Sequence, residues 1–215
     1  VAGVDRTITG RVVLESPPDT LDRNELKLGV ALQERASLRA PVDDRLAFEI
    51  RGVGPLPYQF RLTGLPEGGY FQTLRLGGRD LPAPEIEIPE EGSPGPLEVL
   101  IAFDAATLSG TVQPPESVGR GHRVTHATVA LFPEENQSAY LVVRRIATDP
   151  TGVFTLTGIA PGVYTAFALP GGSVLEWDDP EVRRQFARYG RSVDLGRGKK
   201  VTVELTLAPE SDGSQ

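Results

Sequence analysis

The stretch FTLTGIAPGVY at residues 154–164 has a counterpart earlier in the chain, FEIRGVGPLPY at residues 48–58. Both begin with Phe and carry an aliphatic residue two positions on, Gly four on, Pro seven on and Tyr ten on. The matching pairs are Phe48/Phe154, Ile50/Leu156, Gly52/Gly158, Val53/Ile159, Pro55/Pro161 and Tyr58/Tyr164. Self-similarity at a fixed offset indicates repeated supersecondary units. The chain is therefore expected to contain two copies of one domain.

The sequence around this repeat is typical of short β-strands. In VTVELTL (residues 201–207) and LEVLIAF (residues 97–103) apolar residues alternate with other residues, which is the pattern of a half-buried strand. Gly and Pro recur between such runs at the spacing of about 8 to 12 residues that all-β sandwiches show. These features predict an all-β protein built of β-sandwiches or barrels, one for each copy of the repeat.

The turns of the repeat have specific chemistry. Asp149 and Gly152 bracket a turn in which Gly occupies the position where a positive φ is free. Pro161-Gly162 predicts a type II turn at the next corner, after which Tyr164 enters a strand with its ring buried and its hydroxyl on loop backbone.

The first copy departs from this pattern at one turn. Asp43 matches Asp149 in offset, but Leu46 stands where Gly152 does. Because a branched aliphatic residue disfavours positive φ, we expect the turn of the first copy to differ from that of the second.

The length of 215 residues and the position of the repeat predict two domains of ordinary size. We assign residues 1–105 to the first, residues 106–208 to the second and residues 209–215 to a polar tail. One short helix is expected as an insertion in the second domain, because DDPE (residues 178–181) resembles a helix start and Gly190 a helix end. Val182, Phe186 and Tyr189 would face the sandwich.

Composition excludes several classes of partner. The net charge is −7, which argues against nucleic acid. No apolar run approaches the roughly 20 residues that a membrane helix requires, so the chain is not expected to span a membrane. It contains no Cys and no Met, even at position 1. We therefore expect a chain that begins after processing or is part of a longer protein.

The second half resembles a known family. The motif DPTGVFTLTGIAPGVYTAFA (residues 149–168), with GTV at Gly110 and ATVALF at residues 127–132, is similar to the carboxypeptidase regulatory-like domain, a prealbumin-like β-sandwich of seven strands. Together with the repeat, this resemblance implies two tandem prealbumin-like or Ig-like seven-stranded β-sandwiches. The tandem form resembles that in large secreted proteins of acidobacterial type. This resemblance implies an extracellular or cell-surface bacterial protein, whose relatives serve mostly as accessory or structural modules.

No catalytic, metal-binding or cofactor-binding residues are predicted. His122 and His126 are the only histidines, and neither has the nearby Glu that a zinc peptidase motif contains. No serine lies in a G-x-S-x-G sequence. We therefore expect a protein that is not an enzyme.

A carbohydrate platform is one hypothesis for binding. Trp177 is the only Trp and is flanked by Glu176, Asp178 and Asp179, and sugar sites combine aromatic rings with carboxylates. The alternative is that Trp177 packs the helix start onto the sandwich. The neighbouring acids suit a helix cap or, alternatively, calcium.

Self-assembly is the other hypothesis. Val1, Val4 and Ile8 make residues 1–8 an apolar segment that can serve as a free or exchanged strand, adding to the sheet edge of a neighbour. The preferred function is a non-enzymatic extracellular structural or adhesive protein that assembles with protein partners or with itself. The alternative is a carbohydrate-binding or spacer module of a larger secreted enzyme or receptor.

Overall fold

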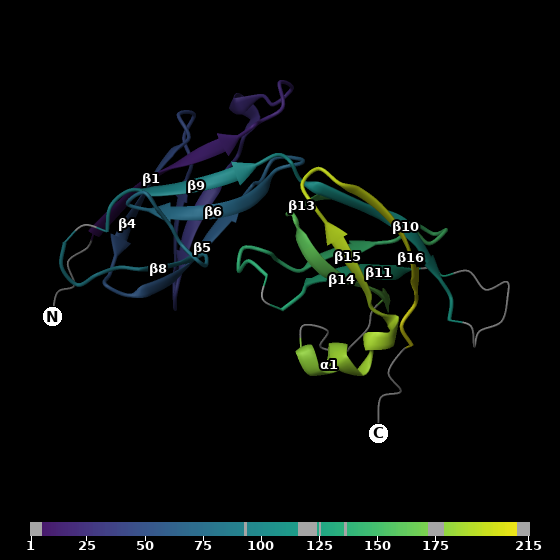
Figure 1. Cartoon of the computed structure of the whole chain (residues 1–215). Helices are drawn as coiled ribbons and strands as arrows, with labels where there is room; N and C mark the ends of the chain where they lie inside the picture. The colour runs from purple at the N-terminus through teal and green to yellow at the C-terminus, as the bar shows by residue number, and fades with distance from the viewer. Residues whose placement is uncertain are drawn as a thin grey trace. The chain divides into compact units, whose positions relative to one another are not determined.

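The computed structural model of the chain describes residues 6–92, 94–115, 124, 126–135, 137–171 and 179–209. It divides into two compact units (Figure 1). Unit 1 consists of Val1–Ala105 together with Ser138–Tyr140, and unit 2 consists of Ala106–Gln137 and Leu141–Gln215.

Unit 2 is a seven-stranded β-sandwich. Its strands are β10 (Ala106–Gln113), β11 (Ala127–Pro133), β12 (Arg144–Ala147), β13 (Val153–Ile159), β14 (Gly162–Pro170), β15 (Arg191–Leu195) and β16 (Lys200–Thr206). One sheet has the order β13-β10-β16 and the other β12-β11-β14-β15. Their inward side chains, among them Leu131, Phe154 and Tyr164, form one core. The seven-stranded sandwich predicted for this half is confirmed.

Unit 1 has the same plan with a further hairpin. Its strands are β1 (Arg6–Glu15), β2 (Gly29–Gln33), β3 (Ser37–Pro41), β4 (Ala47–Val53), β5 (Pro57–Thr63), β6 (Tyr70–Leu76), β7 (Arg79–Asp80), β8 (Glu85–Glu87) and β9 (Leu97–Ala102), with a 3-10 turn η1 (Arg23–Glu25). One sheet has the order β4-β1-β9-β6-β7 and the other β3-β2-β5-β8. Without β6 and β7, the strand order is that of unit 2.

The two units match in register. In unit 1, Gly10 of β1 lies opposite Phe48 of β4 and beside Leu97 of its parallel partner β9. In unit 2, Gly110 lies opposite Phe154 and beside Val203. Both antiparallel pairs also contain a bulge, on β4 opposite Arg6–Ile8 and on β13 opposite Ala106–Leu108. The repeated sequence is thus a repeated set of strand pairs.

These two glycines lie under aromatic rings. A Cβ at Gly10 would lie 2.7 Å from the carbonyl oxygen of Leu97 and still closer to the Phe48 ring. At Gly110 it would lie 2.9 Å from the carbonyl carbon of Val203 and 3.1 Å from Cζ of Phe154. Each repeated Phe therefore needs a residue without a side chain on the neighbouring strand.

The prediction that the Leu46 turn differs is wrong. Leu46 has φ +62° and Gly152 has φ +82°. Leu46 N donates to Asp43 O at 2.9 Å, and Gly152 N donates to Asp149 O at 3.0 Å. Both Asp side chains accept from the backbone N–H groups two and four residues later. The Asp hydrogen bonds hold Leu46 in a conformation that a leucine seldom adopts.

The predicted type II turn at Pro161-Gly162 is also wrong. A type II turn requires positive φ at its third residue, and Gly162 has none. A Cβ at Gly162 would lie 2.6 Å from Cδ1 of Leu141, the end of a flexible side chain, so that side chain would have to move to admit another residue.

The tyrosines of the repeat cap loop backbone, as expected for Tyr164. The Tyr164 hydroxyl donates to Ala160 O at 2.8 Å, and the Tyr58 hydroxyl accepts from Gly54 N at 3.1 Å. The partner lies four residues earlier in both cases. Burial of the ring raises the pKa of Tyr164 to about 12.

The connection after the fifth shared strand holds different elements in the two units. Between β5 and β8, unit 1 contains the β6–β7 hairpin, and β6 pairs with β9. Between β14 and β15, unit 2 contains α1 (Pro180–Gln185) and the 3-10 turn η3 (Ala187–Tyr189). The predicted helix is confirmed: Val182, Phe186 and Tyr189 pack against a small cluster on the outer face of the sheet.

Unit 1 is discontinuous in sequence because it includes Tyr140. This side chain is 7% exposed and belongs to the core of unit 1, where its ring meets Phe71 edge-on at 5.1 Å between centroids. Its hydroxyl accepts from Leu74 N at 3.1 Å and donates toward Leu81 O and Ala83 O at 3.0 and 3.1 Å. Burial raises the pKa of Tyr140.

Candidate interaction surfaces

Strand β16 is an edge strand with an open side. Lys199 O accepts from Thr107 N, and Leu207 N donates to Gln113 O, both at 2.9 Å. Because backbone groups alternate in direction along a strand, the N–H and C=O groups of Thr202, Glu204 and Thr206 face away from β10. From Lys200 to Glu204 no described strand pairs with this side of β16. Beyond Glu204 this side is taken by β14, since a parallel bridge joins Leu207 to Ala168 and Ala208 N donates to Ala168 O at 2.8 Å.

The same position is occupied in unit 1. Strand β9, which corresponds to β16, pairs with β6 over the register Tyr70↔Ala102 to Leu76↔Leu97. In unit 2 the described residues between β14 and β15 contain α1 and no strand. The β16 edge therefore has the backbone geometry that supports an added strand in the sister unit.

Arginine side chains cover parts of both edges of this sheet. Arg144 donates to Gly158 O at 2.7 Å and Thr157 O at 3.1 Å, where the bulge on β13 turns two successive carbonyls outward. On β16 one carbonyl is covered, since Arg191 donates to Glu204 O at 3.2 Å. Charged side chains often protect sheet edges in this way, and β16 is the less protected of the two.

The apolar N-terminal segment is only partly within the described residues. Val1 and Val4 lie outside them. Ile8 is 1% exposed and lies in β1 between β4 and β9. The expectation that Ile8 belongs to a free strand is corrected by this placement, because its backbone and side chain serve the chain's own sheet and core.

The proposed carbohydrate platform also falls mostly outside the described residues, which include neither Trp177 nor Glu176 nor Asp178. Asp179 is the N-cap of α1, and its carboxylate accepts from Glu181 N at 2.7 Å. This carboxylate is engaged by the helix start rather than presented to a ligand.

A groove of about 510 Å³ lies beside α1. Its aromatic floor is covered, because the Arg183 guanidinium stacks 4.6 Å above the centroid of Phe132. Glu134 in its wall accepts from Ser192 Oγ at 2.6 Å and from Thr165 Oγ1 at 3.3 Å. The ring and the carboxylate are thus already engaged within the protein.

The repeated motif occupies the core and corners of each sandwich. Phe48, Tyr58, Phe154 and Tyr164 are buried, and Gly52, Gly152 and Gly158 have positive φ. Pro55, Pro161 and Gly162 lie at or beside the connections into the next strand. Asp149 holds its turn through three hydrogen bonds from Thr151 and Val153, which lower the pKa of its carboxyl. We interpret these motif residues as structural.

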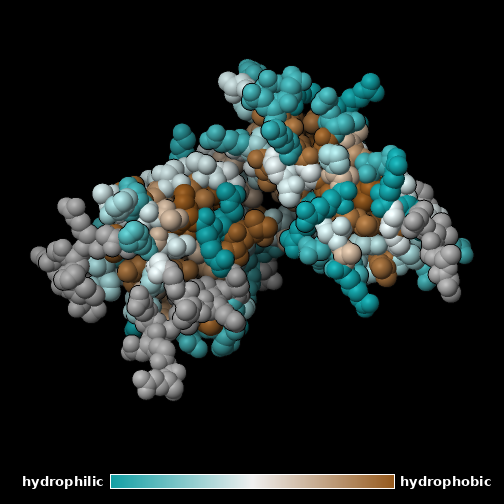
Figure 2. Space-filling view, turned by 180° about the vertical axis from the view of Figure 1, so that it is seen from behind, coloured by the Kyte–Doolittle hydropathy of each residue, from teal (hydrophilic) through white to brown (hydrophobic). Residues whose placement is uncertain are grey.

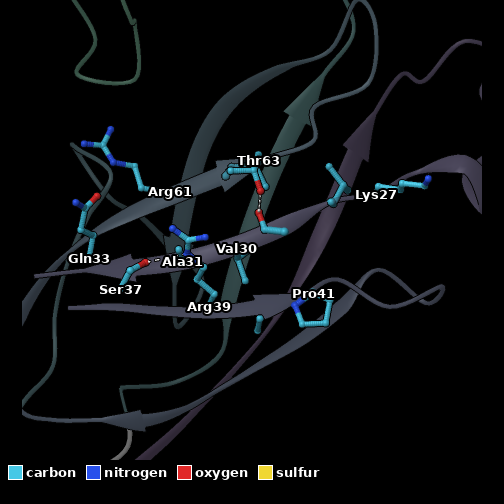
Figure 3. A pocket seen from close by; sticks show the side chains of 13 residues that line it. Lys27, Val30, Ala31, Gln33, Ser37, Arg39, Pro41, Arg61 and Thr63 are labelled. Carbon is cyan, nitrogen blue, oxygen red and sulfur yellow. Dashed lines mark hydrogen bonds between the residues drawn. The ribbon is translucent and has the colours of Figure 1, made fainter.

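A second groove of about 640 Å³ lies on the outer face of strands β3, β2 and β5 (Figure 3). Its floor is formed by the small residues Gly29 and Ala31. Arg39 and Arg61 lie directly across from Ala31 on the two neighbouring strands, and Lys27 lies at one end. Figure 2 shows that polar side chains dominate the visible surface of both units, with apolar side chains between them.

The sequence analysis predicted neither the open edge of β16 nor the groove on strands β3, β2 and β5. Arg39 and Arg61 belong to alternating runs, SLRAP and PYQFRLT, whose outward positions can be read from the sequence. Their convergence on Ala31 depends on which strands are neighbours, and the sequence alone did not provide that pairing.

Within the described part of the chain, no group of three or more His, Asp or Glu side chains is placed to hold a metal ion. In the same residues, no helix is both long enough and apolar enough to cross a membrane.

No family model matches the sequence, and no curated protein is significantly similar to it. Distant similarities to solved structures exist. The Bacillus anthracis TIE protein gives a TM-score of 0.33 at 14% identity, covering 94% of this chain and 34% of that one. This chain thus spans about a third of that protein's length.

Two other solved structures are pilins. A streptococcal ancillary pilin gives a TM-score of 0.33 at 11% identity, with 94% of this chain and 68% of the pilin covered. GBS52, the minor pilin of Streptococcus agalactiae, gives a TM-score of 0.35 at 10% identity, with 97% of this chain and 99% of the pilin covered. The assignment of two tandem β-sandwiches rests on the strands and sheets described above.

Proposed function

We propose that this protein is a non-enzymatic structural or adhesive module that assembles with other protein chains through the open edge of β16. The observation that carries the proposal is the pair of outward-facing residues Thr202 and Glu204, whose N–H groups have no partner strand, on a strand whose counterpart β9 has a partner. Unpaired edges of this kind accept strands from other chains.

The cellular setting belongs to the same proposal. The resemblance to carboxypeptidase regulatory-like domains implies a bacterial protein that is secreted or held at the cell surface. The partner is a strand of another copy or of another surface protein. Carbohydrate binding near Trp177 remains the alternative, and it predicts a monomer whose tryptophan fluorescence changes with glycan.

The test replaces Thr202 with proline. Proline has no backbone N–H, and the N–H of Thr202 faces the open side, so Thr202→Pro removes a donor that an added strand needs and leaves the hydrogen bonds to β10. Thr202→Val is the matched control, because it also loses the side-chain hydroxyl that contacts Ser109 but keeps the N–H.

Assembly is measured by negative-stain electron microscopy and sedimentation velocity of the full chain. We expect wild type and Thr202→Val to form oligomers or filaments and Thr202→Pro to remain monomeric. Assembly that is equal in all three proteins, or dispersed monomers in all three at every concentration, would exclude the β16 edge as the contact.

A further inference from the structure

The outer face of the sheet β3-β2-β5-β8 is divided by charge. Its outward residues include Arg39 on β3, Arg61 on β5 and Lys27 at the end of the groove, all exposed. At the opposite side of the same sheet, β8 presents Glu85 and Glu87 outward, since the inward residues Ile86 and Ile88 are buried. One sheet face thus carries a basic groove beside an acidic strand.

The cations of the groove have no carboxylate partner within the described residues. Arg39 donates to Ser37 Oγ at 3.3 Å, and no ion pair joins Arg39, Arg61 or Lys27 to an acid there. The Cα atoms of Arg39 and Arg61 lie about 10 Å apart, one strand on each side of Ala31. Glu85 of β8 lies diagonally across from Arg61, since it pairs with Gln59, but the two form no ion pair. The short side chain of Ala31 forms the floor of the groove, where an incoming carboxylate would lie between the two arginines.

The acidic side is similarly available. Glu85 accepts a hydrogen bond from the neutral Gln59 amide, and Glu85 and Glu87 are both exposed. Two residues apart on one strand, they lie about 7 Å from each other on the same face. The exposed Glu90 and Glu91 follow directly, with the Arg6 guanidinium donating to the carbonyls of Pro89 and Glu90 beside them, so the negative charge of this side is carried chiefly by Glu85 and Glu87.

We propose that two copies of this chain pack these faces against each other about a twofold axis. The acidic strand β8 of each copy then lies in the basic groove of the other, with Glu85 and Glu87 against Arg39 and Arg61. A twofold contact of this kind requires a self-complementary patch, and this face supplies both halves. The pairing adds a second contact to the assembly proposed above and rests on that proposal for its biological role.

Charge favours a second copy as the occupant. Residues 1–105 contain 11 basic and 17 acidic residues, a difference of −6, so most approaches between two copies bring like charges together. The groove is where positive charge is concentrated without partners, and β8 offers paired carboxylates in an extended strand. Arg binds carboxylates in a forked, oriented geometry, which fixes how the two faces meet.

The experiment is a charge exchange in the full chain, read by sedimentation velocity at about 0.15 M salt, where the Debye length is about 8 Å and only close pairs interact strongly. One variant is Arg39→Glu/Arg61→Glu, and the other is Glu85→Arg/Glu87→Arg. Either double variant alone gives the groove and β8 charges of the same sign. We therefore expect its self-association to weaken about tenfold or more. An equimolar mixture of the two should regain a dimer, as should the fourfold variant that carries both exchanges.

The same series in the Thr202→Pro background separates this contact from the β16 edge. A dimer that persists there and follows the charge exchange supports the face-to-face pairing even if edge assembly fails. A wild-type chain that stays monomeric at about 0.5 mM would overturn the pairing, because contacts of millimolar affinity or better would be visible. Association unaffected by either double variant would overturn it as well, as would a groove that binds polyglutamate while the chain never pairs. Circular dichroism of each variant checks that these exposed substitutions leave the fold intact.

Discussion

Gly10 and Gly110 show what a single atom can decide in this fold. At each position a Cβ would meet backbone of the parallel strand and the ring of the repeated Phe. Neither glycine has positive φ, so it is close packing, not backbone freedom, that requires them. A phenylalanine ring can pack directly on the backbone of the neighbouring strand only where that strand has a glycine.

We expect Gly110→Ala to lower the free energy of unfolding of unit 2 by about 2 to 4 kcal/mol, because a backbone carbonyl of β16 must move to admit the methyl group. The measurement is urea unfolding followed by circular dichroism. Ser109→Ala, on the opposite face of the same strand, serves as the control and should change the value by less than about 0.5 kcal/mol. Equal stability of Gly110→Ala and wild type would contradict the close approach.

Tyr164 makes the stability of unit 2 sensitive to high pH. Its pKa is about 12 in the folded chain, against about 10 for an unperturbed tyrosine. Between these values the unfolded chain has lost the proton that the folded chain retains, so stability falls as pH rises from 10 to 12. Below pH 10 the contribution of the neutral hydroxyl is fully present.

The test compares wild type with Tyr164→Phe. At pH 8 the variant should be less stable by about 1 kcal/mol, since it lacks the hydrogen bond to Ala160 O. As pH rises through 10 to 12 that difference should shrink and then reverse, because phenylalanine has no proton to lose. Thermal unfolding at a series of pH values measures it, and a difference that stays constant up to pH 12 would be inconsistent with a buried neutral Tyr164.

Residue patterns revealed the repeat but misjudged two turns within it. Leu46 was expected to change its turn, yet the Asp43 carboxylate accepts the same two backbone N–H groups as Asp149 does. Local hydrogen bonds outweigh the conformational preference of the leucine. At Pro161-Gly162 the dipeptide suggested positive φ, whereas Gly162 lacks it and lies against the Leu141 side chain, a contact between segments that no local pattern reveals.

At the scale of elements, the alternation of apolar residues predicted where the strands lie but not which strands are neighbours. The runs at residues 97–103 and 201–207 were both expected as strands, and they are β9 and the strand β16 with the bridge residue that follows it. Strand β9 is covered by β6 because the insertion in unit 1 is a hairpin. The insertion described in unit 2 is a helix, and β16 keeps an open side. The helix was predictable because its cap, its proline and its apolar spacing are all local.

The β6–β7 hairpin was not predicted as an addition to the seven-stranded plan. Its strand YFQTLRL has the same alternation as any other strand. The sequence therefore does not indicate that this strand pairs with the outer edge of β9. For the same reason the open edge of β16 could not be predicted from residues 200–206, whose alternation is that of a paired strand.

At the scale of the whole molecule, the units are not two consecutive pieces of chain. Tyr140 is separated from the rest of unit 1 in sequence, and yet its hydroxyl satisfies Leu74 N next to the irregular pairing of β6 with β9. The boundary expected after residue 105 therefore leaves out one core residue of the first domain. Nothing in the local sequence around Tyr140 distinguishes it from a loop tyrosine.

We expect Tyr140→Phe to destabilise unit 1 by about 1 to 3 kcal/mol, because a buried backbone N–H and two carbonyls lose their partner while the ring remains. A fragment of residues 1–105 should show at least the same loss, since it lacks the ring as well. Urea unfolding of the full chain, with Tyr189→Phe as a control in unit 2, measures the effect. Wild-type stability of both Tyr140→Phe and the fragment would show that Tyr140 contributes nothing to unit 1.

The insertion between the fifth strand of the shared plan and the next one has a use beyond this protein's own assembly. One copy of the duplicated domain accommodates a hairpin there and the other a helix, on the same framework of paired strands. A position that has accepted two unrelated structures is a natural entry point for a third. A foreign peptide grafted between β14 and β15 would be displayed on a scaffold that contains no cysteine, and so without any disulfide to rearrange.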